Sequence, residues 1–287
     1  MPELPEVEII KQSLQKSVIN KKINKVLIKN RNLRFRIQRG LEKELNNNKI
    51  SHISRKSKYL IIHFKNKRFL VIHFGMTGTL HLIKKKKNYQ NTNLSFYHST
   101  NLPKKNNHIF FFFDNFKLIY NDPRRFGFIK FFFNKNELLK YFANKGLEPL
   151  DSSFNLEYVK KKILNRKKNI KNIFLDQSLI SGIGNIYANE ILYYSKINPN
   201  KKVNKLKDDE IKKIIKFSKY VLKQAIYKGG SSIKDFKNIK GNSGSYQKEF
   251  RVYDREGESC STKNCIGTIK KILISNRSTF LCKYCQK

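Results

Sequence analysis

The first eight residues, MPELPEVE, combine two prolines with three carboxylates. Glu3, Glu6 and Glu8 lie here, although the whole chain of 287 residues has only 21 acidic side chains. If Met1 is removed, Pro2 carries a secondary amine, and α-amino groups have pKa values of about 7.7 to 8.0, so part of it is unprotonated near neutral pH. Such an amine can attack an electrophilic carbon and form an iminium, with a neighbouring carboxyl as acid or base. The start of the chain is therefore a candidate catalytic site.

The same stretch also has a structural interpretation. Chain ends fray, and Pro5 suits the first turn of a helix, where its missing N–H is not needed. The two interpretations are compatible. Apolar residues recur at helical spacing and predict that this end packs against a core; they are Val7, Ile10, Leu14 and Val18.

All four cysteines lie in the last 28 residues. Cys260 and Cys265 are separated by four residues, Cys282 and Cys285 by two, and the two pairs by 16. This spacing is typical of two knuckles that share one tetrahedral zinc ion, and a reducing compartment favours a metal over disulfides. Four unrelated thiols are the alternative, which leaves the spacing unexplained.

The zinc site predicts a β-hairpin between the two cysteine pairs. Its strands would be 270–274 and 279–281, with Asn276, Arg277 and Ser278 at the tip. A basic residue on a hairpin held by a metal can contact a phosphate.

The chain is strongly basic, with 61 Lys and Arg against 21 Asp and Glu and a formal net charge of +40. Basic side chains that neutralise phosphates release counterions, so nucleic acid is the natural partner. Part of the excess can instead reflect an AT-rich coding sequence, since Lys, Asn, Ile and Phe are all abundant. Only 12 of the 61 basic residues are arginine, so the arginines are the more informative positions.

The first half contains short runs of β-forming residues without long helices between them, which indicates a sandwich or barrel. The lysine- and asparagine-rich segment 84–107 is expected to be a surface insertion. The expected strands are 26–29, 50–54, 59–64, 69–74, 81–83, 108–113, 117–120 and 126–131.

From about residue 137 the pattern becomes helical, so a domain boundary is expected near 135–150. One helix should begin at residues 208–210, where three acids suit its positive end, and stop at Gly229 and Gly230. Residues 181–185, SGIGN, precede another helix, and their glycines would let backbone N–H groups approach a phosphate; an ordinary interhelical turn is the alternative. No apolar stretch of about 18 residues and no signal-peptide pattern is present, so we expect a cytoplasmic protein.

The chain carries eight motifs in collinear order along essentially its whole length. They are MPELPEVE at the start, RKSKYL (55–60), HFGMTG (73–78), NDPRRFG (121–127), GLEPL (146–150), SGIGNIYANE (181–190), GGSSIKDF (229–236) and the terminal four-cysteine hairpin. Together these motifs resemble those of the formamidopyrimidine-DNA glycosylase family. The resemblance implies a multidomain α+β protein with a catalytic β-sandwich and flanking helices at 1–135 and a helix-two-turn-helix domain at 136–230. A flexible lesion-recognition loop with its lead-in would follow at 231–250, and a zinc-finger β-hairpin at 251–287.

The resemblance also implies an activity. Such an enzyme binds damaged double-stranded DNA, excises oxidised purines such as 8-oxoguanine and formamidopyrimidines, and then nicks the abasic site by β,δ-elimination. It would act in base-excision repair as a monomer, with no membrane association and with one structural Zn2+ held by Cys260, Cys265, Cys282 and Cys285.

By the same resemblance, Pro2 is the nucleophile on C1′ of the damaged nucleotide, and Glu3 is the acid that helps open the deoxyribose ring. Glu6 supports this site, and Lys58 assists catalysis and holds a phosphate. Arg277 binds phosphate near the lesion and takes part in the second elimination.

A second group of residues is implied to contact DNA. Met76, Arg124 and Phe126 stand at positions that fill the hole left by the extruded base, whose unstacking costs roughly a few kcal/mol. By pattern alone, Met76 and Phe126 would be core residues. Asn185 and Arg166 stand at phosphate-contact positions.

Two departures from the family pattern are visible. Asn106 stands where the family usually has a histidine, so a DNA contact there is lost or moves to His108. The first cysteine knuckle has four intervening residues where two are usual, which reshapes one loop.

Two rival functions remain open. One is an endonuclease VIII-like glycosylase for oxidised pyrimidines, and the other is a non-catalytic basic zinc-ribbon protein that binds nucleic acid. Leu4 and the complete GGSSIKDF motif favour the purine enzyme, and the zinc-ribbon hypothesis leaves the acidic N-terminus unexplained.

Overall fold

The computed structural model describes residues 1–84, 92–93, 105–231 and 245–287. The chain forms two compact units. The first holds Met1–Ala143 and Lys228–Gln247, and the second holds Asn144–Tyr227 and Lys248–Lys287. Most of the expected insertion at 84–107 and most of the expected loop at 231–250 lie outside the described residues.

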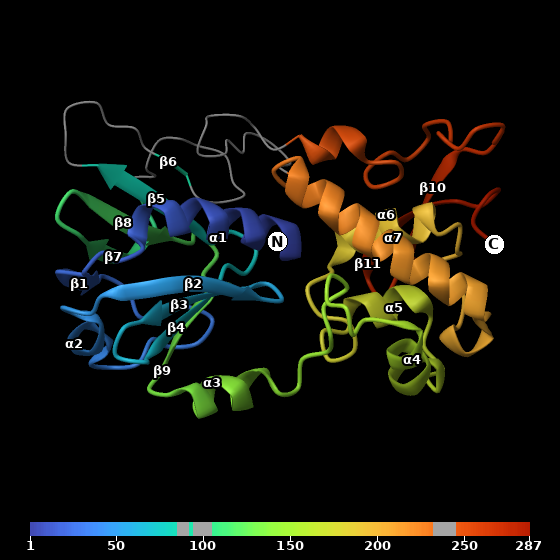
Figure 1. Cartoon of the computed structure of the whole chain (residues 1–287). Helices are drawn as coiled ribbons and strands as arrows, with labels where there is room; N and C mark the ends of the chain where they lie inside the picture. The colour runs from blue at the N-terminus through green and yellow to red at the C-terminus, as the bar shows by residue number, and fades with distance from the viewer. Residues whose placement is uncertain (85–91, 94–104, 232–244) are drawn as a thin grey trace. The chain divides into compact units, whose positions relative to one another are not determined.

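The described residues of the first unit form two antiparallel sheets and three α-helices (Figure 1). One sheet has the strand order β2-β3-β4-β9, and the other has the order β1-β7-β8-β5-β6. The first sheet comprises β2 (Ile50–Lys56), β3 (Tyr59–Phe64), β4 (Phe69–His73) and β9 (Phe128–Phe132). The second comprises β1 (Lys25–Ile28), β7 (Asn107–Phe112), β8 (Phe116–Asn121), β5 (Thr79–Lys84) and β6 (Thr92–Asn93). The helices are α1 (Leu4–Val18), α2 (Leu41–Leu45) and α3 (Lys135–Phe142).

A single hydrophobic core joins α1 to both sheets. The stripe of α1 that the sequence predicted, Val7, Ile10, Leu14 and Val18, is fully buried. These side chains pack with inward-facing residues of the strands, and α1 lies against β2. The core therefore fixes the N-terminal end of α1, which the candidate catalytic residues occupy.

The second unit is helical and ends in a β-hairpin. Its long helix α7 starts at the acids predicted at 208–210 and ends at Tyr227, just before Gly229 and Gly230, as the sequence predicted. The apolar positions of α7 form one buried stripe. The helical segments are α4 (Leu156–Val159), η1 (Lys160–Leu164), α5 (Ile170–Leu175), α6 (Asn185–Tyr194), η2 (Val203–Lys205) and α7 (Asp208–Tyr227), and η3 (Tyr246–Glu249) spans the boundary with the first unit. The hairpin pairs β10 (Ile269–Ile274) with β11 (Arg277–Cys282).

The predicted α+β architecture is confirmed: a sandwich with flanking helices, a helical region and a terminal hairpin. One detail of the hairpin prediction was wrong. Arg277 is not at the tip, because it pairs with Ile274 as the first residue of β11. The tip consists of Ser275 and Asn276, both with positive φ angles (49° and 57°), which suits a two-residue turn.

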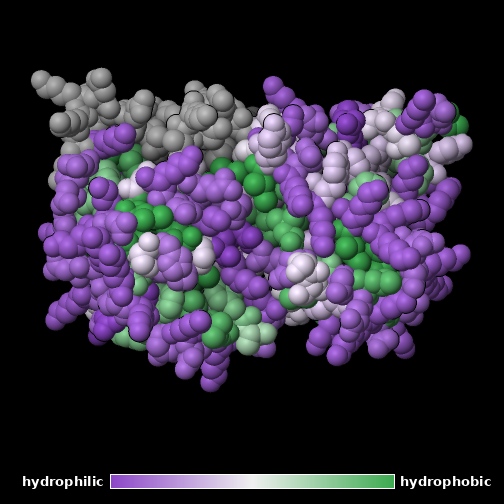
Figure 2. Space-filling view, in the orientation of Figure 1, coloured by the Kyte–Doolittle hydropathy of each residue, from purple (hydrophilic) through white to green (hydrophobic). Residues whose placement is uncertain are grey.

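The surface is polar. Hydrophilic residues cover most of the face of each unit that Figure 2 shows. Among the described residues, no helix combines the length and the apolar character that crossing a membrane requires.

Candidate active site and nucleic-acid interface

The acids at the N-terminus are buried where α1 begins. Glu3 caps the helix, and its side chain and that of Glu6 form a reciprocal capping box with backbone N–H groups. The backbone N–H of Glu3 donates to Glu6 Oε2 at 2.9 Å. Glu3 and Glu6 are 3% and 4% exposed, so both carboxylates are held in a fixed position close to Pro2, which is also buried.

Glu6 also holds a segment from far along the chain. Its Oε1 accepts hydrogen bonds from Ser231 N at 2.9 Å and from Ser231 Oγ at 3.1 Å. Gly230, with φ +83°, lies so near that an added Cβ would sit 3.2 Å from Glu6 Oε1. The GGSS motif therefore supplies a glycine where the backbone turns and approaches the carboxylate, and a serine that satisfies it.

Lys58 lies in the tight turn between β2 and β3 and is 5% exposed. Arg55 fixes this turn, because its Nη1 donates to Ser57 O at 2.9 Å and its Nε donates to Glu8 at 3.0 Å. Glu8, the third acid of the N-terminal motif, therefore anchors Arg55 and through it the turn that carries Lys58, which links the RKSK motif to MPELPEVE.

These groups surround the N-terminal amine. Burial lowers the pKa of the Met1 amino group below its usual value, and the positive charges of Lys58 and Arg124 lower it as well, while Glu3 and Glu6 oppose the shift. A less basic amine is neutral more often at neutral pH, and only the neutral form is a nucleophile.

The predicted void-filling residues lie on two neighbouring loops of the first unit. Met76 and Phe126 are 40% and 43% exposed. They are therefore surface residues and not the core residues that pattern alone predicted. The Arg124 guanidinium lies 4.4 Å from the centre of the Phe126 ring. The two loops touch, since a Cβ on Gly75 would lie 2.3 Å from the carbonyl carbon of Phe126.

Asp122 holds the NDPRRFG loop in shape and is fully buried. Its carboxylate accepts hydrogen bonds from Thr77 Oγ1 at 2.5 Å and from Gly127 N at 2.8 Å. Thr77 Oγ1 in turn accepts from Arg124 N at 3.2 Å. The exposed side chains are therefore carried by a rigid buried network.

Asn106 and His108 differ in accessibility. Asn106 is exposed, with φ 65°, just before β7. His108 is 3% exposed, and its Nε2 lies 2.8 Å from Asp122 O. His108 thus supports the NDPRRFG loop from inside.

In the second unit, two of the three residues implied to bind phosphate lie at the hairpin. Asn185, the first residue of α6, donates from Nδ2 to Ser278 O at 3.0 Å, and Ser278 follows the exposed Arg277. Arg166 is exposed after η1, and none of its contacts ties it to this group. The structure therefore brings Asn185 and Arg277 together and leaves Arg166 separate from them.

The residues that attach the hairpin to the helices were not predicted from the sequence. Lys171 on α5 is fully buried and donates to Thr279 Oγ1 at 2.6 Å and to Ser278 O at 3.0 Å. Glu190 on α6 is also fully buried and accepts from three consecutive backbone N–H groups, those of residues 251–253, at 2.9 to 3.0 Å. Glu190 could have been noticed in the sequence, because it is a charged residue among the apolar positions of α6. Lys171 could not, because nothing in the sequence distinguishes it from the many other lysines.

The four cysteines converge as predicted. Their sulfur atoms all lie within 4.8 Å of one another, with Cys260 to Cys285 at 3.7 Å and Cys265 to Cys282 at 3.6 Å. Zinc–thiolate bonds of about 2.3 Å in a tetrahedron place sulfurs about 3.8 Å apart. The cluster therefore fits one four-thiolate metal ion, and Tyr193 adds a hydroxyl 3.4 Å from Cys260 Sγ.

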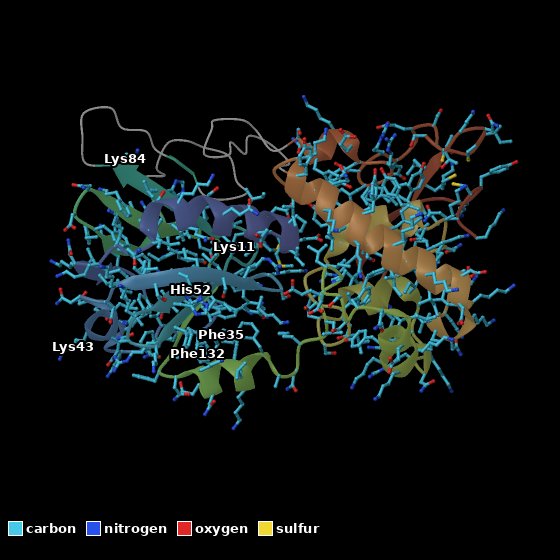
Figure 3. The ribbon with its side chains drawn as sticks, viewed as in Figure 1. Lys11, Phe35, Lys43, His52, Lys84 and Phe132 are labelled. Carbon is cyan, nitrogen blue, oxygen red and sulfur yellow. The ribbon has the colours of Figure 1, made fainter. Side chains whose placement is uncertain are left out.

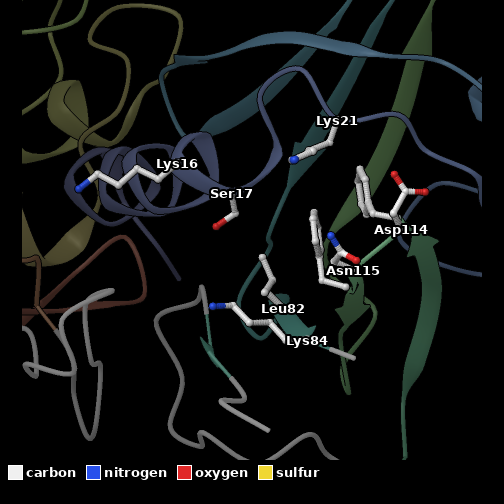
Figure 4. A pocket seen from close by; sticks show the side chains of 9 residues that line it. Lys16, Ser17, Lys21, Leu82, Lys84, Asp114 and Asn115 are labelled. Atoms are coloured by element: carbon white, nitrogen blue, oxygen red, sulfur yellow. The ribbon is translucent and has the colours of Figure 1, made fainter. Parts of the chain in front are cut away.

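A pocket of about 270 Å³ lies elsewhere in the first unit (Figure 4). Lys16, Ser17, Lys21 and Lys84 line it together with residues 113–116. Lys16 is near the C-terminal end of α1, about 18 Å along the helix from Leu4 at 1.5 Å per residue. The pocket is thus at the opposite end of α1 from the buried acids.

Comparison with known proteins gives a consistent result over the whole chain. Residues 1–129 match the formamidopyrimidine-DNA glycosylase N-terminal domain, and residues 145–237 match the formamidopyrimidine-DNA glycosylase H2TH domain. The formamidopyrimidine-DNA glycosylase of Rickettsia bellii is 43% identical over 290 residues, with complete coverage of both chains. That of Rickettsia felis is 43% identical and covered to 98%.

Solved structures of the Lactococcus lactis formamidopyrimidine-DNA glycosylase (Fpg) are similar to this chain as well. A variant in complex with Fapy-dG-containing DNA gives a TM-score of 0.88 at 32% identity, with full coverage of both chains. A complex with DNA containing an abasic site gives 0.87 at 31% identity and 99% coverage of both. The wild-type protein with oxidised-pyrimidine-containing DNA gives 0.86 at 32% identity, again with full coverage of both.

Proposed function

The chain belongs to the formamidopyrimidine-DNA glycosylase family of base-excision-repair glycosylases and AP lyases, and we propose that it excises oxidised purines from duplex DNA through an iminium formed on Pro2. The observation that carries this proposal is that Glu3, Glu6 and Lys58 are all buried beside the N-terminus, next to the buried Pro2, and that the amino group of Met1 there has a lowered pKa. A general DNA-binding protein has no use for such a site.

The proposed reaction begins after Met1 has been removed. The Pro2 nitrogen attacks C1′ of the damaged nucleotide, the bond from C1′ to the base breaks, and the proton that the Pro2 nitrogen loses goes to the departing base. Glu3 donates a proton to the ring oxygen as the deoxyribose opens and the iminium forms. The iminium acidifies the C2′ proton, whose loss expels the 3′ phosphate. A second elimination expels the 5′ phosphate.

The remaining site residues have supporting roles in this proposal. Lys58 places a positive charge beside the amine, which keeps the amine neutral, and it can hold a phosphate of the damaged strand. Glu6 orients the terminus through Glu3 N. Arg277 and Asn185 form a phosphate-binding pair on the second unit, with Arg277 also assisting the second elimination.

The proposed DNA contacts extend beyond that pair. Arg166 is an additional exposed phosphate contact. Asn106 rather than His108 is the residue of its segment that can reach DNA, because His108 is buried. We propose four functional regions: the catalytic domain at 1–135, the helix-two-turn-helix domain at 136–230, the lesion-recognition loop with its lead-in at 231–250 and the zinc finger at 251–287. We also propose that the enzyme acts on DNA in the bacterial cytoplasm.

Zinc is the metal that the four thiolates suit best, since structural sites of this kind are tetrahedral and closed. When bound, the ion staples the hairpin that carries Arg277. It takes no part in the chemistry at Pro2.

The substrate choice is testable directly. Duplexes containing 8-oxoguanine or thymine glycol are incubated with the protein and borohydride, which reduces an iminium to a stable adduct. We expect trapping with 8-oxoguanine; trapping only with thymine glycol would favour the oxidised-pyrimidine enzyme, and none with either would favour a binding protein. Oxidised pyrimidines are retained as a second substrate class because a Lactococcus lactis relative has been crystallised with such DNA.

Replacing Arg124 by Ala should impair excision of a paired lesion more than cleavage of a preformed abasic site. Arg124 and Phe126 already lie in contact and can fill the space that the extruded base leaves in the duplex. An abasic site has no base to extrude, so its cleavage depends less on Arg124. We expect a loss of about tenfold or more in single-turnover excision of 8-oxoguanine and a smaller loss on the abasic duplex. Equal losses on the two substrates would contradict the void-filling role.

A further inference from the structure

The arginines divide into two groups by their partners. Several form ion pairs within the fold, such as Arg55 with Glu8 and Arg31 with Glu42. Arg34 and Arg36 are exposed, and neither forms an ion pair with a carboxylate in the part of the chain that the structure describes. Because arginine is scarce in this sequence, two exposed arginines that flank an exposed aromatic residue, without a carboxylate partner among the described residues, need an explanation.

That aromatic residue is Phe35, which is 57% exposed. It lies in a short loop that an isolated β-bridge between Asn32 and Arg36 closes. Two buried side chains, Leu33 at 9% and Ile37 at 1% exposure, anchor the loop in the core. The loop therefore presents Phe35 in a fixed geometry, and little conformational entropy would be lost if a ligand covered it.

The loop is tied to the strand that follows the void-filling residues. Arg34 N donates to Gly127 O at 3.1 Å, directly after Phe126. The Phe35 ring packs edge-on against Phe128 at 5.0 Å between centroids. Figure 3 shows Phe35 as a stick on the first unit.

The same strand connects Phe35 to the catalytic side of the unit. Phe128 stacks on His73 at 5.2 Å, and His73 lies 4.9 Å from the ring of Tyr59, the neighbour of Lys58. His73, the first residue of the HFGMTG motif, accepts a hydrogen bond on Nδ1 from Gly75 N at 3.1 Å. The rings of Tyr59, His73 and Phe128 thus form a chain of contacts from the turn that carries Lys58 to the exposed Phe35.

We infer that Arg34, Phe35 and Arg36 form an additional DNA-contacting element, which rests on the proposed function. The two guanidinium groups bind phosphates of the duplex flanking the lesion, and the Phe35 ring lies against the deoxyribose between them. Charge complementarity identifies the partner, since two exposed arginines beside an apolar ring, with Arg34 5.8 Å from the ring centre, match an anionic backbone with apolar sugar faces. Continuity with Arg124 and Phe126 places the contact beside the extruded nucleotide.

The inference is tested by the affinity of Phe35→Ala for a duplex with a tetrahydrofuran abasic analogue, measured by fluorescence anisotropy. Removing the ring should weaken binding about tenfold, because apolar contact with the sugar is lost. The matched control is Phe133→Ala: Phe133 is 47% exposed and also lies beside an arginine, with Arg68 5.6 Å from its ring. The control should bind as the wild type does.

The arginines are tested by salt dependence. Arg36→Gln should lower the slope of log affinity against log salt by about 0.9, the value for one phosphate contact. Lys43→Gln removes the same charge from α2 and should leave the slope unchanged. Thermal melting of each variant verifies that the fold is intact, and Arg36→Gln, at an exposed position, provides the test if Phe35→Ala unfolds.

The outcomes separate this inference from the proposed function. If the wild type forms the borohydride adduct but Phe35→Ala and Arg36→Gln bind like their controls, the loop does not contact DNA. If the wild type forms no adduct, the proposed catalytic function fails, whatever the variants bind.

Discussion

A protein that keeps Met1, or that carries an uncleavable tag before Pro2, is expected to bind damaged DNA but to excise nothing. In that form the Pro2 nitrogen is a tertiary amide, which has no basic lone pair and cannot form an iminium. Binding should survive because the proposed phosphate contacts of Lys58, Asn185 and Arg277 do not involve the terminus. Excision and borohydride trapping should both fall below detection.

The position of the adduct is the sharper measurement. Intact mass spectrometry of the trapped complex, followed by proteolysis, locates the DNA-derived mass on one peptide. A mass on the N-terminal peptide supports Pro2, whereas one on the peptide that contains Lys58 would show that Lys58 and not Pro2 is the reacting amine.

Glu3→Gln is the companion variant, since an amide keeps the shape of the carboxyl but cannot donate a proton. This variant should lose excision of 8-oxoguanine and retain some cleavage at an abasic site.

Replacing Cys282 by Ser should unfold the hairpin and abolish tight DNA binding while the first unit stays folded. Zinc in small four-ligand sites contributes about 10 to 16 kcal/mol of apparent binding free energy at neutral pH, and the cluster of Tyr193, Val252 and Phe280 beside the cysteines is too small to replace it. Without the hairpin, Arg277 loses the strand that places it next to Asn185.

Metal analysis provides the measurement, with one zinc per chain expected in the wild type and none in Cys282→Ser. Thermal melting should then show two separate transitions in the variant, the second unit unfolding first. Active wild-type protein without zinc, or a variant that keeps full affinity for DNA, would contradict this role of the metal.

Local chemistry and periodicity predicted much of the fold and the cysteine cluster. The stripe from Val7 to Val18 identified α1, the cysteine spacing identified the cluster, and the acids at 208–210 with the glycines at 229–230 delimited α7. Each of these signals lies within a short window of sequence, and each reflects a direct requirement of helix burial, metal geometry or helix termini.

Other features depend on contacts between distant residues, which a single sequence does not reveal. The bond from Ser231 to Glu6 and the buried Lys171 beneath the hairpin belong to this class. Isolated apolar residues were also misleading, since Phe126 has the sequence character of a core residue but is exposed because Asp122 holds its loop outward. The hairpin turn begins one residue and ends two residues earlier than predicted, because strand pairing, rather than β propensity, decides where a turn begins.

The contact between Glu6 and the segment at 230–231 has a consequence for how the protein is made. The two partners are separated by 225 residues, so the first unit cannot close around its own terminus until most of the chain has left the ribosome. At about 5 to 20 residues per second, this delay lasts on the order of 10 to 50 seconds. During that interval the terminus lacks the Ser231 bonds that later fix Glu6, which leaves time for the removal of Met1, and N-terminal analysis of ribosome-bound chains should find Pro2 already exposed. The order of synthesis thus lets the amine be generated first and enclosed afterwards.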